Sequence, residues 1–373
     1  MRLAMRWGIL GLAVAFAIAG NEAQAGSMGS IAPWTPAASP DPTSPYQATS
    51  PNGSFVTWKY PDALLRQADG SYLDVGNLGF TGGSHSEPYG VNDQGTVVGF
   101  SRVNLRDNHA FVSYQDSSSD SGRQIVNLGT LGGKNSSATA VNAGGTVIGQ
   151  ADNGQWGAHA FAVTPNGYAS HNGYYSPQLQ DLGTLGGKNS TAFAISSNGQ
   201  VVGASNIRDD QSQFVSNTQF GSGEAVHGFL YNNGIMKDLG TIAGFKTSVA
   251  VGLNNAGQVV GYVTNNPSYL YHLYTSGSAS DAHAFLYSDG KMTDINELLP
   301  KGSGWLLEYA QSISDSDVIR GTGIYQGKEQ GYEFSLSSDT AQAAPIPEPS
   351  TLVLFAVIAA GIFAKRRVRS RPR

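Results

Sequence analysis

Residues 181–195 are DLGTLGGKNSTAFAI and residues 127–141 are NLGTLGGKNSSATAV, so one segment occurs twice with few changes. Weaker copies begin at Asp74, Asp238 and Asp294. A strand similar to Val-Val-Gly follows each copy, and its glycines are 50, 54, 58 and 60 residues apart, at positions 99, 149, 203, 261 and 321. Self-similarity at this period indicates a repeat protein whose units stack on one another.

Each unit contains four short apolar runs separated by turn residues such as Asn-Gly. In the clearest unit the runs are residues 191–195, 200–205, 227–232 and 236–240. Short runs rich in Val, Ile, Phe and Tyr between such turns are hairpin signals. The pattern predicts a four-stranded antiparallel sheet, and the length of the unit is that of a β-propeller blade.

Small residues support the propeller prediction. One position of the first strand is always small, and its occupants are Gly90, Ala140, Ala194, Gly252 and Ser312. Such a column suits the crowded innermost strands near a propeller axis. The recurring glycine of the second strand likewise indicates a close backbone approach or a bulge.

The fold class predicted is all-β, a β-propeller of four-stranded antiparallel blades over residues 54–336. We expect five blades, with the strand 72–78 completing the last blade and so removing free edges. Residues 55–60 are left over and could begin a sixth blade, which is the alternative count. A β-solenoid is the rival fold.

Both ends of the chain carry signals that we expect to lie outside the propeller. Residues 1–25 have Arg2 and Arg6, an apolar stretch and a small-x-small ending, which predicts a signal peptide cleaved between Ala25 and Gly26. A short membrane anchor is the alternative. Residues 26–53, rich in Pro and Ser, and residues 337–346 are interpreted as linkers.

The C-terminal segment, residues 347–373, has three parts. Pro347-Glu348-Pro349 is followed by an uncharged span over 350–364 and a basic tail. The span predicts a short transmembrane helix with its basic end in the cytoplasm. It is either a transient anchor or an ordinary anchor that is retained.

This order of parts resembles the PEP-CTERM sorting signal of Gram-negative exopolysaccharide producers. The resemblance implies processing by an exosortase near Pro347, Glu348 and Pro349. A third recurring element, His-Ala-Phe at 109–111, 159–161 and 283–285 and His-Gly-Phe at 227–229, makes the body similar to extracellular HAF-repeat proteins. That family implies an exported repeat protein and brings no established catalytic residues.

Composition excludes several classes of function. The chain has 373 residues, no Cys and a formal net charge of −5. Disulfides, thiolate metal sites and a Cys nucleophile are therefore excluded, and the charge argues against nucleic-acid binding. The segment containing Lys134 is not a phosphate loop, because Asn135 follows the lysine where Ser or Thr is required.

The candidate binding residues lie on one end of the predicted blades. Insertions over residues 206–226 and 264–282 lengthen the same connection, between the second and third strands, and in a propeller this connection shares a face with the links between blades. Amides next to aromatic rings suit a sugar. The predicted ligand-binding residues are Lys134, Asn135, Lys188, Asn189, Tyr269, Tyr271 and Tyr274. The alternative is that they only pack loops and form turns.

The recurring His109, His159, His227 and His283 are expected to be structural, as are the recurring Asp181, Asp238 and Asp294 with Asn127 in the same slot. We predict no metal site, cofactor or catalytic residue. The expected function is an exported, non-catalytic binding or structural module at the cell surface or in the exopolysaccharide matrix of a Gram-negative bacterium. Its expected partners are signal peptidase, exosortase and extracellular polysaccharide, with transient inner-membrane anchoring and no nucleic acid. The alternative is a secreted glycan-active enzyme using Glu87 and Glu308 in adjacent blades.

Overall fold

The computed structural model describes residues 30–34, 48–49, 55–59, 62–67, 70–81, 85–117, 119, 122–155, 157–168, 178–207, 225–265 and 281–336. The signal peptide with Ala25 and Gly26, the segment 347–373 and the three tyrosines of the second insertion lie outside the described residues. Among the described helices, none is long and apolar enough to cross a membrane.

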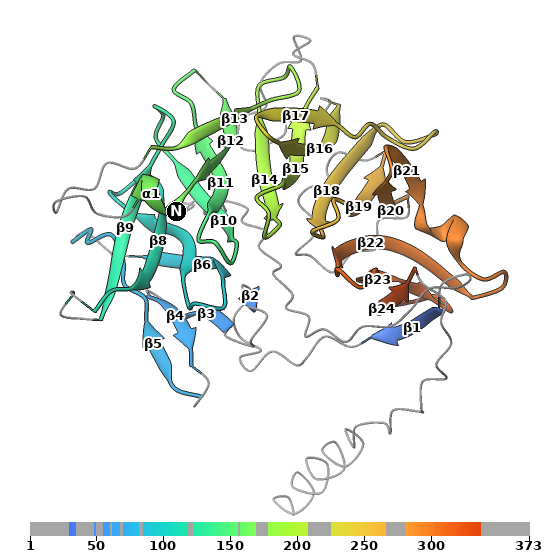
Figure 1. Cartoon of the computed structure of the whole chain (residues 1–373), viewed down its shortest axis with the longest axis horizontal. Coiled ribbons are helices and arrows are strands. Elements are labelled where there is room, and N and C mark those ends of the chain that lie inside the picture. Colours follow the sequence, from blue (N-terminus) through green and yellow to red (C-terminus); the bar gives the residue numbers. More distant parts are fainter. Residues whose placement is uncertain are drawn as a thin grey trace, which may run out of the picture. The chain divides into compact units, whose positions relative to one another are not determined.

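The described strands form six four-stranded antiparallel sheets (Figure 1). Five sheets follow the chain order. They are β2–β5 (Ala48–Thr49, Phe55–Lys59, Asp62–Arg66, Tyr72–Asp74), β6–β9 (Ser86–Val91, Val97–Arg102, Asn108–Gln115, Arg123–Gly129), β10–β13 (Ser136–Val141, Val147–Asp152, Ala158–Val163, Gln180–Gly183), β14–β17 (Ser190–Ile195, Val201–Asn206, Val226–Asn232, Ile235–Asp238) and β18–β21 (Thr247–Leu253, Val259–Thr264, His283–Ser288, Lys291–Asp294). The four strands predicted within residues 191–240 are confirmed to within two residues at each end.

The last sheet joins the two ends of the described chain. β22 (Trp305–Ile313), β23 (Val318–Tyr325) and β24 (Lys328–Ser335) are completed by β1 (Ser30–Trp34), which pairs antiparallel with β24. The only helical segments among the described residues are α1 (Pro165–Tyr168) and the 3-10 turn η2 (Ile295–Leu298).

The first strands of successive sheets touch one another, from β2 to β6, β10, β14, β18 and β22, so the sheets follow one another around a common centre (Figure 1). The column of small residues has the predicted role at these contacts. A Cβ on Gly90 would lie 3.1 Å from the Cα of Ala140, and one on Gly252 would lie 3.0 Å from the Cα of Ser312. The fold is therefore a β-propeller with these strands innermost.

The recurring glycine of the second strand lies where two strands and an aromatic ring crowd together. A Cβ on Gly203 would lie 1.9 Å from the carbonyl oxygen of Thr191 and 2.8 Å from the ring of Phe229, the phenylalanine of the third-strand motif. The first strand carries a register shift beside this contact, between Ala192 and Ala194. The sequence predicted a close backbone approach or a bulge at this glycine. The structure has both, the close approach at Gly203 and the irregularity in the first strand beside it.

Three sequence predictions need correction. There are six sheets rather than the favoured five, because the β2–β5 sheet contains residues 55–59 of the leftover stretch but lacks the recurring motifs. The strand that completes the last sheet is β1, whereas β5 pairs with β4. The expected linker 26–53 contains β1 and β2. The sequence pattern did not predict β1 because the strand contains Pro33. An outermost strand tolerates proline, since the backbone groups along its free edge need no partner in the sheet.

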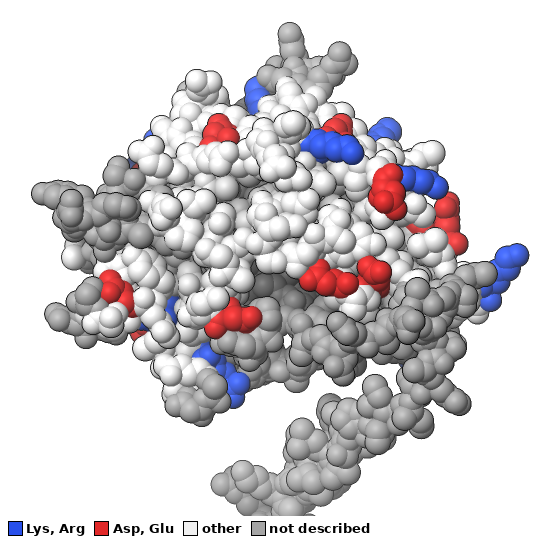
Figure 2. Space-filling view, in the orientation of Figure 1, with Lys and Arg blue, Asp and Glu red and all other residues white. Residues whose placement is uncertain are grey.

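A chain of side-chain amides links the turns between first and second strands. Asn92 donates to the carbonyl of Asn142 at 2.9 Å, and Asn142 donates to that of Ser196 at 3.0 Å. Asn254 donates to the carbonyl of Ser314 at 3.2 Å. On the face shown in Figure 2, charged side chains are few and scattered over a largely uncharged surface. Hydrogen bonds of these amides tie the inner turn of one sheet to that of the next.

Candidate functional site

The loop face comprises the links between sheets and the connections between second and third strands, which meet at one end of the blades. The N–H groups of Leu131 and Gly133 donate to the carbonyl of Asp152 at 3.1 and 3.0 Å. Gly187 donates to the carbonyl of Asn206 in the same way, at 3.1 Å. Each link therefore rests on the end of the second strand that follows it in the chain.

The links of sequence Thr-Leu-Gly-Gly-Lys-Asn have a fixed shape. The Thr184 hydroxyl donates to the carbonyl of Gly187 at 2.8 Å and accepts from the N–H of Gly186 at 3.2 Å. A Cβ on Gly187 would lie 2.3 Å from the Cβ of Asn206, so this position requires glycine. Thr130 and Gly133 repeat these contacts in the preceding link.

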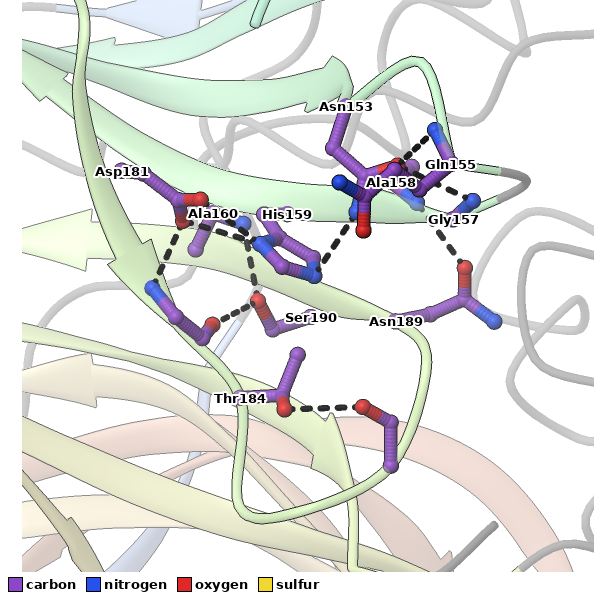
Figure 3. A network of polar contacts seen from close by, with 12 residues as sticks. Asn153, Gln155, Gly157, Ala158, His159, Ala160, Asp181, Thr184, Asn189 and Ser190 are labelled. Atoms are coloured by element: carbon purple, nitrogen blue, oxygen red, sulfur yellow. Dashed lines mark hydrogen bonds and ion pairs between the residues drawn. The ribbon is translucent and has the colours of Figure 1, made fainter.

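The structure gives two of the predicted ligand-binding residues a structural role. Asn189 Oδ1 accepts from the N–H of Ala158 at 3.1 Å (Figure 3). Asn135 Oδ1 accepts from the N–H of Asn108 at 3.1 Å, so both amides fasten the preceding sheet. Asn135 also donates from Nδ2 to Asp152 at 3.1 Å. Lys134 and Lys188 are exposed on the same links.

The recurring histidines pair with the recurring Asp or Asn of the next strand. The Nδ1 atoms of His109, His159, His227 and His283 lie 3.0, 2.8, 2.9 and 2.6 Å from side-chain oxygens of Asn127, Asp181, Asp238 and Asp294. The Nε2 atom of His159 also lies 3.1 Å from the Nδ2 atom of Asn153 (Figure 3). Each of these histidines thus bonds a side chain of the next strand, the kind of contact that a structural role requires.

The same carboxylates also cap turns. Asp181 accepts from the N–H of Gly183 at 2.8 Å, and Asp238 accepts from that of Gly240 at 2.7 Å. These side chains thus hold the chain at the point where the fourth strand becomes the link. No group of three or more His, Asp or Glu in the described part of the chain could hold a metal ion.

A serine clasp, which the sequence analysis missed, joins neighbouring sheets. The Ser190 hydroxyl donates to the carbonyl of Gly183 at 2.5 Å and accepts from the N–H of Ala160 at 2.8 Å (Figure 3). The same pair of bonds recurs at Ser86, Ser136 and Ser248. The signal was present in the repeats, because serine occupies this slot in four of the copies.

The pKa of Asp238 makes the stability of the fold depend on pH in the acidic range. Burial raises this pKa, but the hydrogen bond with His227, the N–H of Gly240 and the charge of His227 together outweigh burial, so the pKa lies below its ordinary value. A depressed carboxyl pKa contributes stability that is present above the unfolded value and lost as the pH falls through the folded value.

We therefore expect the unfolding free energy to decrease below about pH 4 and the Asp238→Asn variant to lose less than the parent protein over that range. Asparagine should keep the geometry because Asn127 fills the same slot beside His109. Urea unfolding at pH 7 and pH 3 measures the effect, with Asp289→Asn in an exposed hairpin turn as control. Equal acid losses in the Asp238→Asn variant and the parent would contradict the expectation.

The two carboxylates of the enzyme alternative have different surroundings. Glu87 accepts from His85 Nε2 at 2.8 Å and from the Tyr89 hydroxyl at 3.1 Å, and its side chain is 14% exposed. Glu308 is only 1% exposed. Adjacency of their blades was expected from five sheets, but a sixth sheet, β2–β5, comes before β6 and contacts it. The expectation of adjacent blades is therefore wrong.

The fold and the loop face define a β-propeller whose sheets are joined by recurring polar clasps. Residues 186–348, less than half of the chain, match the family model described as a protein of unknown function (DUF3466). No curated protein matches the sequence.

Solved propeller-containing structures are similar at low identity. TolB from Acinetobacter baumannii is 14% identical, with 66% of this chain and 52% of TolB covered and a TM-score of 0.39. A gluconolactonase from Xanthomonas campestris is 11% identical, with 78% and 86% covered and a TM-score of 0.36. The β-propeller domain of the Trilobed protease from Pyrococcus furiosus is 8% identical, with 76% and 73% covered and a TM-score of 0.40. The match spans about half of TolB, and 42% of a puromycin hydrolase chain.

Proposed function

We propose that this protein is an exported, non-catalytic six-bladed propeller that binds extracellular polysaccharide through its loop face and so acts as a surface or matrix component. The observation that carries the proposal is the use of the recurring polar residues. The histidines and their Asp or Asn partners join strands within each sheet, and the serine clasps join one sheet to the next. The two longest connections within a sheet, residues 207–225 and 265–282, then belong to the loop face.

The two long connections support the choice of face. They leave the ends of β15 and β19 and return to β16 and β20, so both interrupt the same connection in neighbouring sheets. Lys188 and Asn189 lie at the base of the first, because the Asn189 carbonyl accepts from the N–H of Asn206 at 2.9 Å. The second carries Tyr269, Tyr271 and Tyr274 in its sequence. Aromatic rings beside amides and a cation suit sugar rings and hydroxyls.

Export and sorting are part of the proposal. The expected cleavage site between Ala25 and Gly26 precedes β1, which begins at Ser30, and the Pro347-Glu348-Pro349 motif follows β24, which ends at Ser335. Cleavage at either site would leave every described strand intact. We therefore retain signal peptidase, exosortase and a transient inner-membrane anchor as its processing partners, with a cell-surface or matrix destination.

Glycan-array binding of the purified chain tests the proposed function. We expect binding to extracellular polysaccharides that decreases in the Tyr269→Ala and Tyr271→Ala variants. Tyr72→Ala is the matched control, since Tyr72 is 47% exposed on β5, away from the insertions. Absence of binding, or binding unaffected by the insertion variants, would refute this function.

A glycan-active enzyme is the second candidate, and the contacts of Glu87 favour it. The His85, Glu87 and Tyr89 cluster has no counterpart in the other first strands, where the corresponding residues include Asn135, Ser137 and Thr139. A partly exposed carboxylate between a histidine and a phenol could move a proton. This candidate predicts reducing-sugar release that Glu87→Gln abolishes, whereas the non-catalytic function predicts none.

A further inference from the structure

The innermost strands carry two positions whose residues differ in kind from sheet to sheet. The clasp serine and the column of small residues recur in these strands because the packing of the blades requires them. The residue after the clasp position does not recur, and from β6 onwards its occupants are Glu87, Ser137, Thr191, Val249 and Tyr309. Two residues further on, the occupants are Tyr89, Thr139, Phe193, Val251 and Gln311. The packing of a repeated blade does not explain this variety.

The carboxylate of Glu87 is held in a fixed position. One oxygen lies 2.8 Å from His85 Nε2, and the other accepts from the Tyr89 hydroxyl at 3.1 Å. The rings of both neighbours pack against Phe100, with centroid distances of 5.9 and 5.6 Å. Among the described residues no Lys or Arg pairs with Glu87, so its charge is balanced by one histidine at most. A carboxylate that is only 14% exposed and has so little compensation favours a cation beside it.

Three partly exposed apolar side chains occupy these two positions in later sheets. Phe193, Val251 and Tyr309 lie on β14, β18 and β22 and pack against one apolar cluster that includes Tyr262. The rings of Tyr262 and Tyr309 meet edge to face, with 5.0 Å between their centroids. Neighbouring sheets cover both faces of β14 and β18, so the exposed surface of these side chains faces the common centre (Figure 1). The innermost strands thus present apolar and aromatic surface as well as a carboxylate.

The charges of the innermost strands set the sign of a ligand. The described first strands, β2, β6, β10, β14, β18 and β22, contain Glu87 and Glu308 and no Lys or Arg. The whole chain has a formal net charge of −5 as well, so its field attracts cations and repels acidic polymers. The described residues offer no group of three metal ligands. An organic cation therefore suits this place better than a metal ion or an acidic chain.

We propose that the innermost strands bind an amino-sugar residue near the loop face, with Glu87 receiving its ammonium group. This inference rests on the proposed function for the class of ligand and adds a separate site to it. Glu87 is the second residue of β6, so it lies close to the link that precedes this strand on the loop face. The protonated amino group supplies the cation, and the CH groups of the sugar ring can pack on Tyr309 and Phe193. A neutral sugar supplies only the second contact.

The test measures equilibrium binding of the purified chain to chitosan oligosaccharides, to chitin oligosaccharides of equal length and to oligolysine, at a pH where the amino groups are protonated. The parent chain should bind chitosan about tenfold more tightly than chitin, whose amino groups are acetylated. Glu87→Gln removes the charge at constant size and should abolish this preference. Tyr309→Leu should weaken binding of both oligosaccharides about threefold. The matched control, Glu297→Gln, removes an exposed carboxylate from η2 and should change affinity less than twofold.

The outcomes separate this inference from the proposed function. Equal affinity of the parent chain for chitosan and chitin overturns the amino-sugar site without any variant, and so does an unchanged preference in Glu87→Gln. Tighter binding of oligolysine than of chitosan also overturns it, because a bare cation would then suffice. Either result leaves a sugar-binding face determined by Tyr269 and Tyr271, whereas failure to bind any polysaccharide removes both proposals. Unchanged thermal melting of Glu87→Gln shows that its weaker binding does not come from unfolding.

Discussion

Replacement of Gly203 by alanine is expected to cost roughly 3 kcal/mol or more of unfolding free energy, because the new methyl group has no space. Its Cβ would lie 1.9 Å from the carbonyl oxygen of Thr191, which belongs to the backbone of the innermost strand. A clash with a flexible side chain could relax by rotation, but this one can relax only if two paired strands separate. The ring of Phe229, at 2.8 Å, closes the other side.

Thermal unfolding followed by circular dichroism measures this effect, and a fall of about 10 °C is expected for a domain of this size. Gly144→Ala is the matched control. Its Cβ would meet only Asn142 Oδ1 at 3.4 Å in an exposed turn, so its effect should stay within about 0.5 kcal/mol. If the two variants melted alike, the close packing of second strand, first strand and aromatic ring would be wrong.

Arg123→Ala is expected to destabilise the protein by about 3 kcal/mol, since it removes a buried cation from a set of acceptors. Arg123 is 7% exposed, and its Nη2 donates to the carbonyls of Gly95 and Ser113 at 2.9 and 2.7 Å. Its Nε donates to the Ser113 hydroxyl, which donates in turn to the carbonyl of Val75. One guanidinium therefore fastens β9 to β8, to an inner turn and, through serine, to the preceding sheet.

Burial lowers the pKa of Arg123 to about 10, so the side chain still carries its charge at neutral pH. Arg123→Lys keeps the charge but not the planar fork, and it should give a smaller loss than alanine. Urea denaturation measures both variants, with Arg106→Ala on an exposed loop as control. A loss of unfolding free energy below about 1 kcal/mol for Arg123→Ala would contradict the stabilising role of these hydrogen bonds.

Where the repeats are regular, the sequence predicts the fold well. The strands of the β14–β17 sheet, the inner column of small residues and the crowded glycines all follow from comparison of copies within one chain. Prediction failed where a sheet lacks the motifs. β2–β5 has Asp62 where other third strands have histidine, and its first strand, β2, is only two residues long.

The predicted binding residues have different surroundings. Lys134 and Lys188 are exposed, whereas the side-chain oxygens of Asn135 and Asn189 accept from backbone groups of the preceding sheet, which the sequence did not reveal. A recurring residue can face solvent or the next blade, and periodicity alone does not distinguish the two. The clasp serines and Arg123 show the same limit, because their partners are backbone groups that carry no sequence signature.

The pairing of Ser30 with Ser335 has a consequence for biosynthesis. Of the described strands, β1 is made first and its partner β24 is made last, so β1 must wait while the other sheets assemble from neighbours in sequence. Contacts between distant parts of a chain form slowly, because the intervening segment must be brought together first. A polypeptide that stopped before β24 would therefore carry an early strand with nowhere to dock, and the last sheet can be completed only after β24 has been made.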